Sequence, residues 1–236
     1  MKKTLGIVAI LLGMALGAAS AHADTLMTLT GVGTGNSLDG IYTGPYTGTV
    51  GGVANTPVIC DDFADDSYIG ESWSATVSTV ASLAGNVRWG SETNAQQNYE
   101  IAAWLAETLV STTNATSAED ISYAIWLALD PTDVQNYLAT SDPATLNAAE
   151  GWINTAETAI TSQDLTAADF ANVLVYTPVP GTAVNCNGGP CPANSPQEFL
   201  VVTPEPSSIV MLLIGLIAVL GLARRRRSSI ALAPAN

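Results

Sequence analysis

Two uncharged apolar segments, one near each end of the 236-residue chain, limit how much of it can fold as one body. The first ends in Ala21-His22-Ala23, and the second spans residues 207–223 and runs into four arginines. Between them lie roughly 180 residues, enough for one domain with its own hydrophobic core. We therefore expect residues 24–202 to form a single mature domain.

The N-terminal segment has the three parts of a secretory signal peptide, namely a basic start, an apolar run and a small-residue cut site. Ala21 and Ala23 stand three and one positions before a cut that leaves Asp24 as the first residue. A retained anchor or a buried helix is the alternative, but neither requires these parts in register. The pattern predicts that residues 1–23 are a signal peptide handled by the Sec translocon.

The C-terminal apolar segment is predicted to be a single transmembrane helix. Residues 207–223 contain no charge and reach the short limit for a membrane-spanning helix. Arg224, Arg225, Arg226 and Arg227 follow directly, and arginines beside a span favour the cytoplasmic side. The precursor would thus cross the inner membrane once, with the body outside and residues 228–236 as a short cytoplasmic tail.

A short motif stands immediately before this span. Pro204-Glu205-Pro206, the apolar span and the arginine cluster together resemble the PEP-CTERM sorting signal of Gram-negative bacteria, over residues 203–227. The resemblance implies that a membrane-embedded exosortase recognises Pro204, Glu205 and Pro206 and removes the span. It also implies a mature form at the cell surface or outside the cell, in systems that often make exopolysaccharide and biofilm.

The charge balance excludes several classes of function. Apart from the two ends, Arg88 is the one basic residue, against all 21 acidic residues of the chain. Nucleic acid is excluded as a partner because phosphate binding needs clustered Lys and Arg. His22 is the one histidine, so the mature body lacks the residues of Ser-His-Asp, zinc-histidine and Schiff-base chemistry. We expect no enzyme, and a carboxylate-dependent glycosidase is the remaining catalytic alternative.

Three cysteines remain after export into an oxidising compartment. Cys186 and Cys191 frame the flexible sequence CNGGPC, which predicts a disulfide between them. Cys60 is then left over, and we expect a buried thiol at the end of a strand.

The body changes its hydrophobic period twice, which predicts an α+β fold. Its first part is rich in Gly, Thr and β-branched residues, as expected for strands joined by turns. Helices are expected in NAQQNYEIAAWLAETLV, in TSAEDISYAIWLAL with a Thr116–Glu119 capping box, at residues 131–140 and at residues 143–161. ANVLVYTPVPG and QEFLVVT then predict a C-terminal β-hairpin around the cysteine loop.

A second resemblance lies inside the body. TPVICDDF, followed later by AIWLAL, resembles the thioester domains of bacterial surface adhesins, in which a Cys is bonded to a Gln two residues before Ala-Ile-Trp. Cys60 matches the Cys and Ala124-Ile125-Trp126 the tripeptide, but Ser122 stands at the Gln position. Because serine has no carboxamide, the resemblance implies at most the fold, without the covalent bond.

The acidic segment CDDFADDSYIGES is the candidate metal site. Asp61, Asp62, Asp65 and Asp66 could offer the oxygen ligands that Ca²⁺ prefers, although the spacing does not fit an EF-hand. The alternative is a solvated loop without metal, and no other cofactor is expected.

These observations predict a non-enzymatic exported surface or extracellular-matrix protein that binds exopolysaccharide or a protein partner. Tyr42, Tyr46 and Trp73 are candidate sugar-stacking residues, although core packing could explain each of them. A glycosidase acting on exopolysaccharide and a covalent thioester adhesin are the alternatives.

Overall fold

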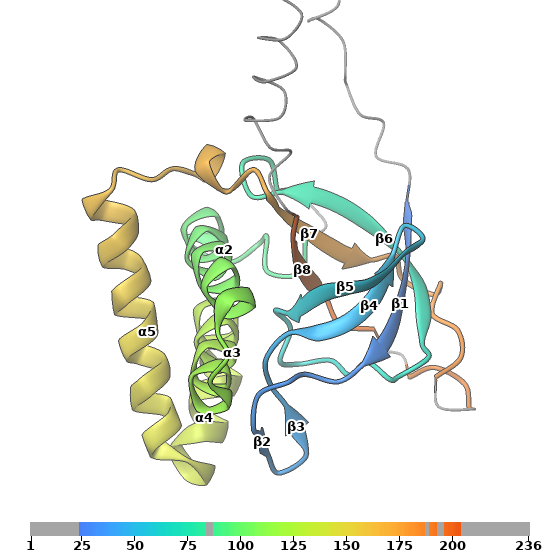
Figure 1. The fold of residues 1–236 in the computed structure, drawn as a ribbon, viewed down its shortest axis with the longest axis horizontal. Coiled ribbons are helices and arrows are strands. Elements are labelled where there is room, and N and C mark those ends of the chain that lie inside the picture. The colour runs from blue at the N-terminus through green and yellow to red at the C-terminus, as the bar shows by residue number, and fades with distance from the viewer. Residues whose placement is uncertain (1–23, 84–86, 187–188, 193–195, 204–236) are drawn as a thin grey trace, which may run out of the picture.

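A β-barrel and a layer of helices lie side by side in the computed structural model (Figure 1), which describes residues 24–83, 87–186, 189–192 and 196–203. Six strands form the barrel: β1 (Thr25–Gly31), β4 (Tyr46–Val50), β5 (Val53–Cys60), β6 (Ser72–Thr79), β7 (Val173–Pro178) and β8 (Phe199–Val202). The short strands β2 (Ser37–Leu38) and β3 (Ile41–Tyr42) make a separate two-stranded sheet.

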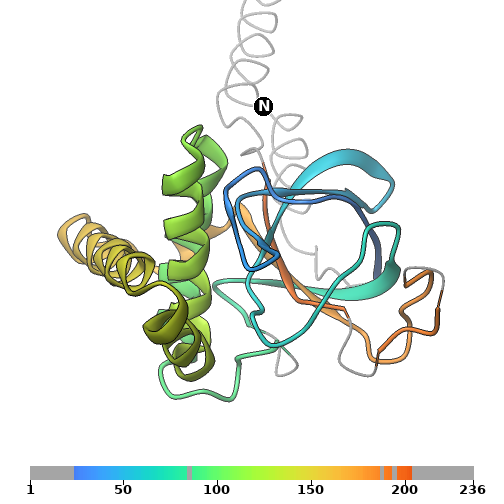
Figure 2. The same ribbon diagram turned by 90° about the horizontal axis from the view of Figure 1, so that it is seen from below.

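The barrel closes in the order β1-β4-β5-β8-β7-β6, with every neighbouring pair antiparallel and β6 returning to β1. Figure 2 shows this ring with the helices on one side of it. The α+β class, the β-rich first part, the central helices and the C-terminal hairpin β7–β8 are confirmed. The hairpin inserts between β5 and β6, so the two ends of the domain belong to one sheet.

Four helices follow β6: α2 (Ala95–Ser111), α3 (Ala115–Leu129), α4 (Pro131–Ser141) and α5 (Pro143–Ser162). Asp130 and Asp142 cap α4 and α5, each of which begins with a proline. A short 3-10 helix, η1 (Ala167–Phe170), leads back to the barrel.

The predicted capping box at Thr116 and Glu119 is wrong. Helix α3 begins one residue before Thr116, and its N-cap is Asn114, whose side chain accepts a hydrogen bond from the Ser117 amide at 2.9 Å. Asparagine is among the best N-cap residues, so it fixes the start of the helix and leaves Thr116 inside the first turn.

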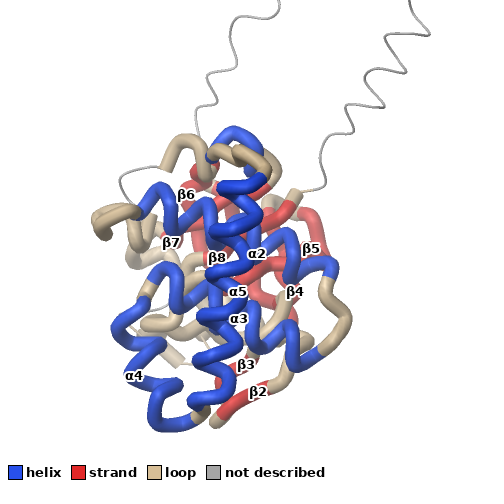
Figure 3. The backbone as a smooth tube through the Cα atoms, turned by 90° about the vertical axis from the view of Figure 1, so that its left-hand side faces the viewer, coloured by secondary structure: helices blue, strands red, loops and turns tan. Residues whose placement is uncertain are grey.

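The helical layer covers the barrel at β7 and β8 through α2 (Figure 3). Strands that face both the barrel interior and the helices bury consecutive residues, as Phe199, Leu200 and Val201 do in β8. The alternating β1, by contrast, buries Met27 and Leu29 and leaves their neighbours more exposed. On α3, the Trp126 indole donates a hydrogen bond to the Cys60 carbonyl at 2.9 Å, which ties the helix to the end of β5.

Among the described residues, none of the helices is sufficiently long and apolar to cross a membrane. Four predicted segments lie outside the described residues, namely the signal peptide, the Pro204-Glu205-Pro206 motif, the span at residues 207–223 with its arginines, and the cytoplasmic tail.

Candidate functional site

A pocket of about 500 Å³ opens where the turn after β5 meets β3, β4 and helix α3. Its wall combines aromatic rings with acidic and amide side chains. The lining residues are Leu29, Val32, Gly40, Ile41, Tyr42, Tyr46, Asp62, Phe63, Asp65, Asp66, Ser67, Tyr68, Ile69, Trp126 and Gln197.

The turn after β5 is held by Asp62, the second aspartate of the acidic segment. Asp62 Oδ1 accepts hydrogen bonds from the Ala64 and Asp65 amides at 3.1 and 3.3 Å, which is the geometry of an Asx turn. The Gln197 side-chain amide donates a hydrogen bond to the Asp62 carbonyl at 2.8 Å. The Gln197 backbone N–H donates to Ser67 Oγ at 2.9 Å. The turn is therefore fixed at both ends against the segment that leads into β8.

Arg88 neutralises part of this acidic wall. Its guanidinium lies 2.6 Å from Asp65 Oδ2 and 3.5 Å from Asp62 Oδ2. The Arg88 side chain is 38% exposed, while those of Asp62 and Asp65 are almost fully buried. One cation thus serves two carboxylates, and the ion pairs are partly shielded from solvent.

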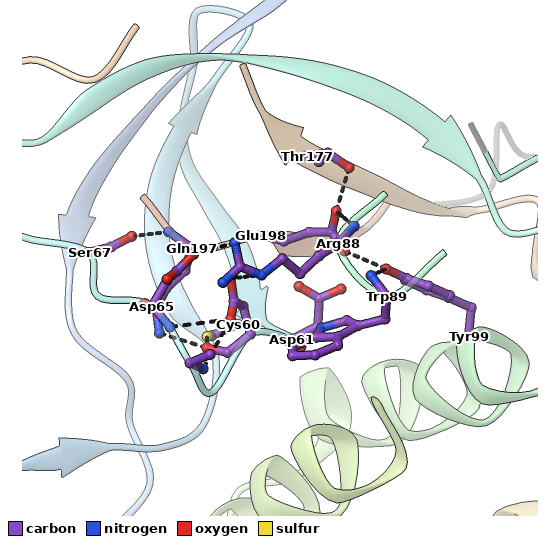
Figure 4. Close-up of polar contacts among 12 residues, drawn as sticks. Cys60, Asp61, Asp65, Ser67, Arg88, Trp89, Tyr99, Thr177, Gln197 and Glu198 are labelled. Carbon is purple, nitrogen blue, oxygen red and sulfur yellow. Dashed lines mark hydrogen bonds and ion pairs between the residues drawn. The ribbon is translucent and has the colours of Figure 1, made fainter. Parts of the chain in front are cut away.

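The alternative of a solvated acidic loop is wrong for three of its four aspartates. Asp61, Asp62 and Asp65 are buried, and only Asp66 is exposed. Figure 4 shows the Asp61 carboxyl on the side of Glu198 and Arg88, apart from Asp65, so these two aspartates do not converge.

A second polar cluster surrounds Glu198, the neighbour in sequence of the pocket residue Gln197 (Figure 4). This carboxylate is fully buried and accepts hydrogen bonds from the Tyr99 hydroxyl at 2.5 Å, the Arg88 amide at 3.0 Å and the Thr177 hydroxyl. It joins β7, β8, helix α2 and the segment before α2. No sequence pattern pointed to Glu198, because an acidic residue before a buried strand has no recognisable motif.

Asp61 and Glu198 form a buried carboxyl pair. Both oxygens of the Asp61 carboxyl are buried without a hydrogen bond from any N–H or hydroxyl group, yet the two side chains are within hydrogen-bonding reach of each other. Two carboxylates cannot bond without a proton, so one of them must be protonated. Because Glu198 already has three donors, the proton belongs on Asp61, which donates to Glu198.

The pKa shifts agree with this assignment. Burial raises the pKa of Asp61 well above its usual value, and the negative charges of Glu198 and Asp62 raise it further. Burial also raises the pKa of Glu198, but the hydrogen bonds from Thr177 and Tyr99 act against that rise. The pKa of Asp62 rises to about 7, chiefly through burial, although Arg88 lowers it.

The described residues contain one group of three side chains with metal-ligand spacing, namely Glu71, Cys186 and Cys191. Cys186 and Cys191 are joined in a disulfide, which removes their thiolates as ligands. The acidic segment is not such a group, and a cation at Asp62 and Asp65 would have to displace Arg88. Calcium at the four aspartates stays a prediction.

Of the residues in the thioester resemblance, Trp126 contacts Cys60 through the Cys60 carbonyl, while the Ser122 hydroxyl is bonded elsewhere. Cys60 is a buried free thiol that donates to the Asp62 carbonyl at 3.2 Å, and burial raises its pKa. Ser122 donates to the Ala118 carbonyl at 2.7 Å and accepts from the Gly44 amide at 2.8 Å. The serine is therefore a structural link between α3 and the segment before β4.

The three aromatic residues predicted to contact sugar differ in their exposure to solvent. Tyr42 and Tyr46 line the pocket, and Tyr42 is 49% exposed. Trp73 is 1% exposed and stacks on Phe199 inside the barrel, so its prediction as a surface residue is wrong. An alternating strand puts every second side chain inside, and Trp73 lies on that face.

Fold and pocket together define a closed β-barrel with a helical layer, carrying an acidic and aromatic cavity at the junction. The profile of the PEP-CTERM protein-sorting motif matches residues 202–227, so the resemblance of the C-terminus is confirmed and the chain carries this sorting motif. The motif indicates an exported protein that an exosortase sorts to the cell surface. No curated protein and no solved structure matches the chain.

Proposed function

We propose that this chain is a non-enzymatic surface or extracellular-matrix protein that binds exopolysaccharide through the pocket beside Asp62. The observation that carries the proposal is the composition of that cavity on a chain with an export-sorting motif. Its aromatic rings offer flat apolar faces, and its carboxylates, hydroxyls and amide offer hydrogen-bonding groups.

A sugar unit has the same two kinds of surface, because its C–H faces are apolar and its rim carries hydroxyls. Pockets of this size commonly combine apolar walls with a few placed polar groups that fix the ligand's orientation. Ion pairs and hydrogen bonds already fix the side chains of Asp62, Asp65 and Gln197. Binding a ligand therefore costs little additional side-chain conformational entropy. Tyr42, half exposed at the edge, is the ring best placed to stack on an incoming sugar.

One observation favours a glycosidase as a second candidate. The pKa of Asp62, raised to about 7, would keep part of this pocket carboxyl protonated near neutral pH, as a general acid requires. Hydrolysis also needs a second carboxylate across the scissile bond. Asp65 is ion-paired to Arg88, which leaves the exposed Asp66 for that role.

The test is gel retardation of the purified protein in purified exopolysaccharide, set beside an assay for released reducing sugar. We expect retardation without release. Tyr42→Ala should weaken binding about threefold, since an exposed ring contact contributes on the order of 0.5–1 kcal/mol. Tyr42→Phe keeps the ring and should bind like the unchanged protein.

Release of reducing sugar that is lost in Asp62→Asn would replace the binder with the glycosidase. Retardation that Tyr42→Ala leaves unchanged would move binding away from this pocket.

A further inference from the structure

We infer that the pocket takes a cationic sugar, namely the protonated amino-sugar unit of a partly or fully de-N-acetylated polysaccharide. The inference rests on the proposed function, because it names the ligand class of the same pocket.

The charges on the pocket wall carry the first step. Three aspartates line it, and no Lys, Arg or His does. Arg88 forms ion pairs with both Asp62 and Asp65, so one cation serves these two carboxylates. The exposed Asp66 has no cation among the described residues, so the pocket keeps an excess of negative charge.

The aromatic rings carry the second step. Tyr42, Tyr46, Phe63, Tyr68 and Trp126 line the same cavity as the carboxylates. The face of an aromatic ring carries partial negative charge and attracts a cation, most strongly where water is partly excluded. Rings and carboxylates therefore favour the same sign of charge, and a uronic acid or a phosphate would meet repulsion from both.

The surrounding protein acts in the same direction. Within the described residues Arg88 is the only basic side chain. The field of the whole domain thus draws cations towards its surface and repels anions over about a Debye length. A polyanionic polysaccharide would be disfavoured before it reached the pocket.

The size and mixed character of the cavity favour a sugar over the side chain of a lysine. About 500 Å³ is more than a single ammonium group and its methylene chain fill. An amino sugar supplies the ammonium for Asp66, a flat C–H face for Tyr42 and hydroxyls for the amide of Gln197. A lysine supplies only the first of these.

The experiment is isothermal titration of the purified full-length protein with four probes at pH 5.5 and low salt. The probes are a glucosamine tetramer, the matching N-acetylglucosamine tetramer, a galacturonic acid tetramer and a tetralysine peptide. We expect the glucosamine tetramer to bind about tenfold more tightly than its acetylated match, with no binding of the galacturonate. Added salt should narrow that difference.

Two variants place the effect at the pocket. Asp66→Asn should reduce the preference for the free amine about threefold, the size expected for an exposed charge contact. Glu150→Gln removes another exposed carboxylate, on α5 and outside the pocket lining, and should leave the preference unchanged.

The outcomes separate this inference from the proposed function. Equal or tighter binding of the acetylated or acidic tetramer, weakened by Tyr42→Ala, keeps a polysaccharide binder and overturns the cationic ligand. Tetralysine binding as tightly as the glucosamine tetramer assigns the pocket to a basic protein partner and overturns the sugar. Absence of binding by any probe contradicts both.

Discussion

Asp61 is the residue whose environment departs furthest from what its sequence neighbours suggest. It belongs to a run of acids that could face solvent, yet its carboxyl is buried beside Glu198 without any N–H or hydroxyl donor. A proton shared by the pair resolves this arrangement. In the folded protein Asp61 then keeps a proton. In the unfolded chain Asp61 releases that proton above the ordinary Asp pKa of about 3.9.

The sign of the pH effect follows from that proton. Since the pKa of Asp61 is raised on folding, the folded state binds more protons than the unfolded state above about pH 4. The free energy of unfolding therefore falls as the pH rises from about 4 towards the raised pKa of Asp61 in the folded protein. The raised pKa values of Glu198 and Asp62 add to the same trend.

Asp61→Asn should remove this penalty, because an amide can donate to Glu198 without carrying a titrating proton. We expect the urea midpoint of the variant minus that of the unchanged protein to be larger at pH 8 than at pH 5. Asp66→Asn, at an exposed carboxylate of the same segment, should show the same difference at both pH values. An Asp61→Asn variant whose relative stability did not change with pH would disprove the shared proton.

Cys60 tests the covalent alternative. The Ser122 hydroxyl occupies the position of the thioester glutamine and is engaged with Gly44 and Ala118. We expect no loss of ammonia in the intact mass, no methylamine adduct, and alkylation of the buried Cys60 only after unfolding. A methylamine adduct on any glutamine would restore the thioester adhesin as the leading function.

At the scale of elements, the start of α3 separates two interpretations of the same sequence. The Thr116–Glu119 spacing predicts one cap, and the structure uses Asn114 instead. Asn114→Ala should lower the free energy of unfolding by about 1 kcal/mol, the usual loss for an N-cap. Thr116→Ala should change it by less than about 0.5 kcal/mol, as for an ordinary surface substitution. Chemical denaturation of both variants makes the comparison, and the reverse order of effects would support the capping box.

Helices were the most predictable elements because their signals are local. Pro131 and Pro143 at first helical positions, each preceded by an aspartate cap, mark the starts of α4 and α5 within the sequence itself. The strands β7 and β8 were likewise visible as apolar runs. Their partners were not, because pairing of β8 with β5 joins residues far apart in the chain.

At the scale of the whole molecule, closure of the barrel creates the candidate site. It brings Gln197 and Glu198, next to β8, against Asp61 and Asp62 after β5, across most of the length of the domain. The acidic segment and two of the pocket tyrosines could be predicted from composition. Arg88, Phe63, Trp126 and Glu198 could not, since their roles depend on contacts that only the folded barrel makes.

The predicted signal peptide and the sorting motif lie on either side of this body. The sorting motif at residues 202–227 begins directly at the end of β8, so little chain separates the folded domain from the processing signal. We therefore expect both ends of the chain to be removed while the domain stays intact.

The intact mass of the protein recovered from outside the producing cells tests that expectation most directly. We expect a species that begins at Asp24, ends close to Pro204-Glu205-Pro206 and retains all of the barrel and helices. A recovered protein that still carried Arg224 to Arg227 would contradict it.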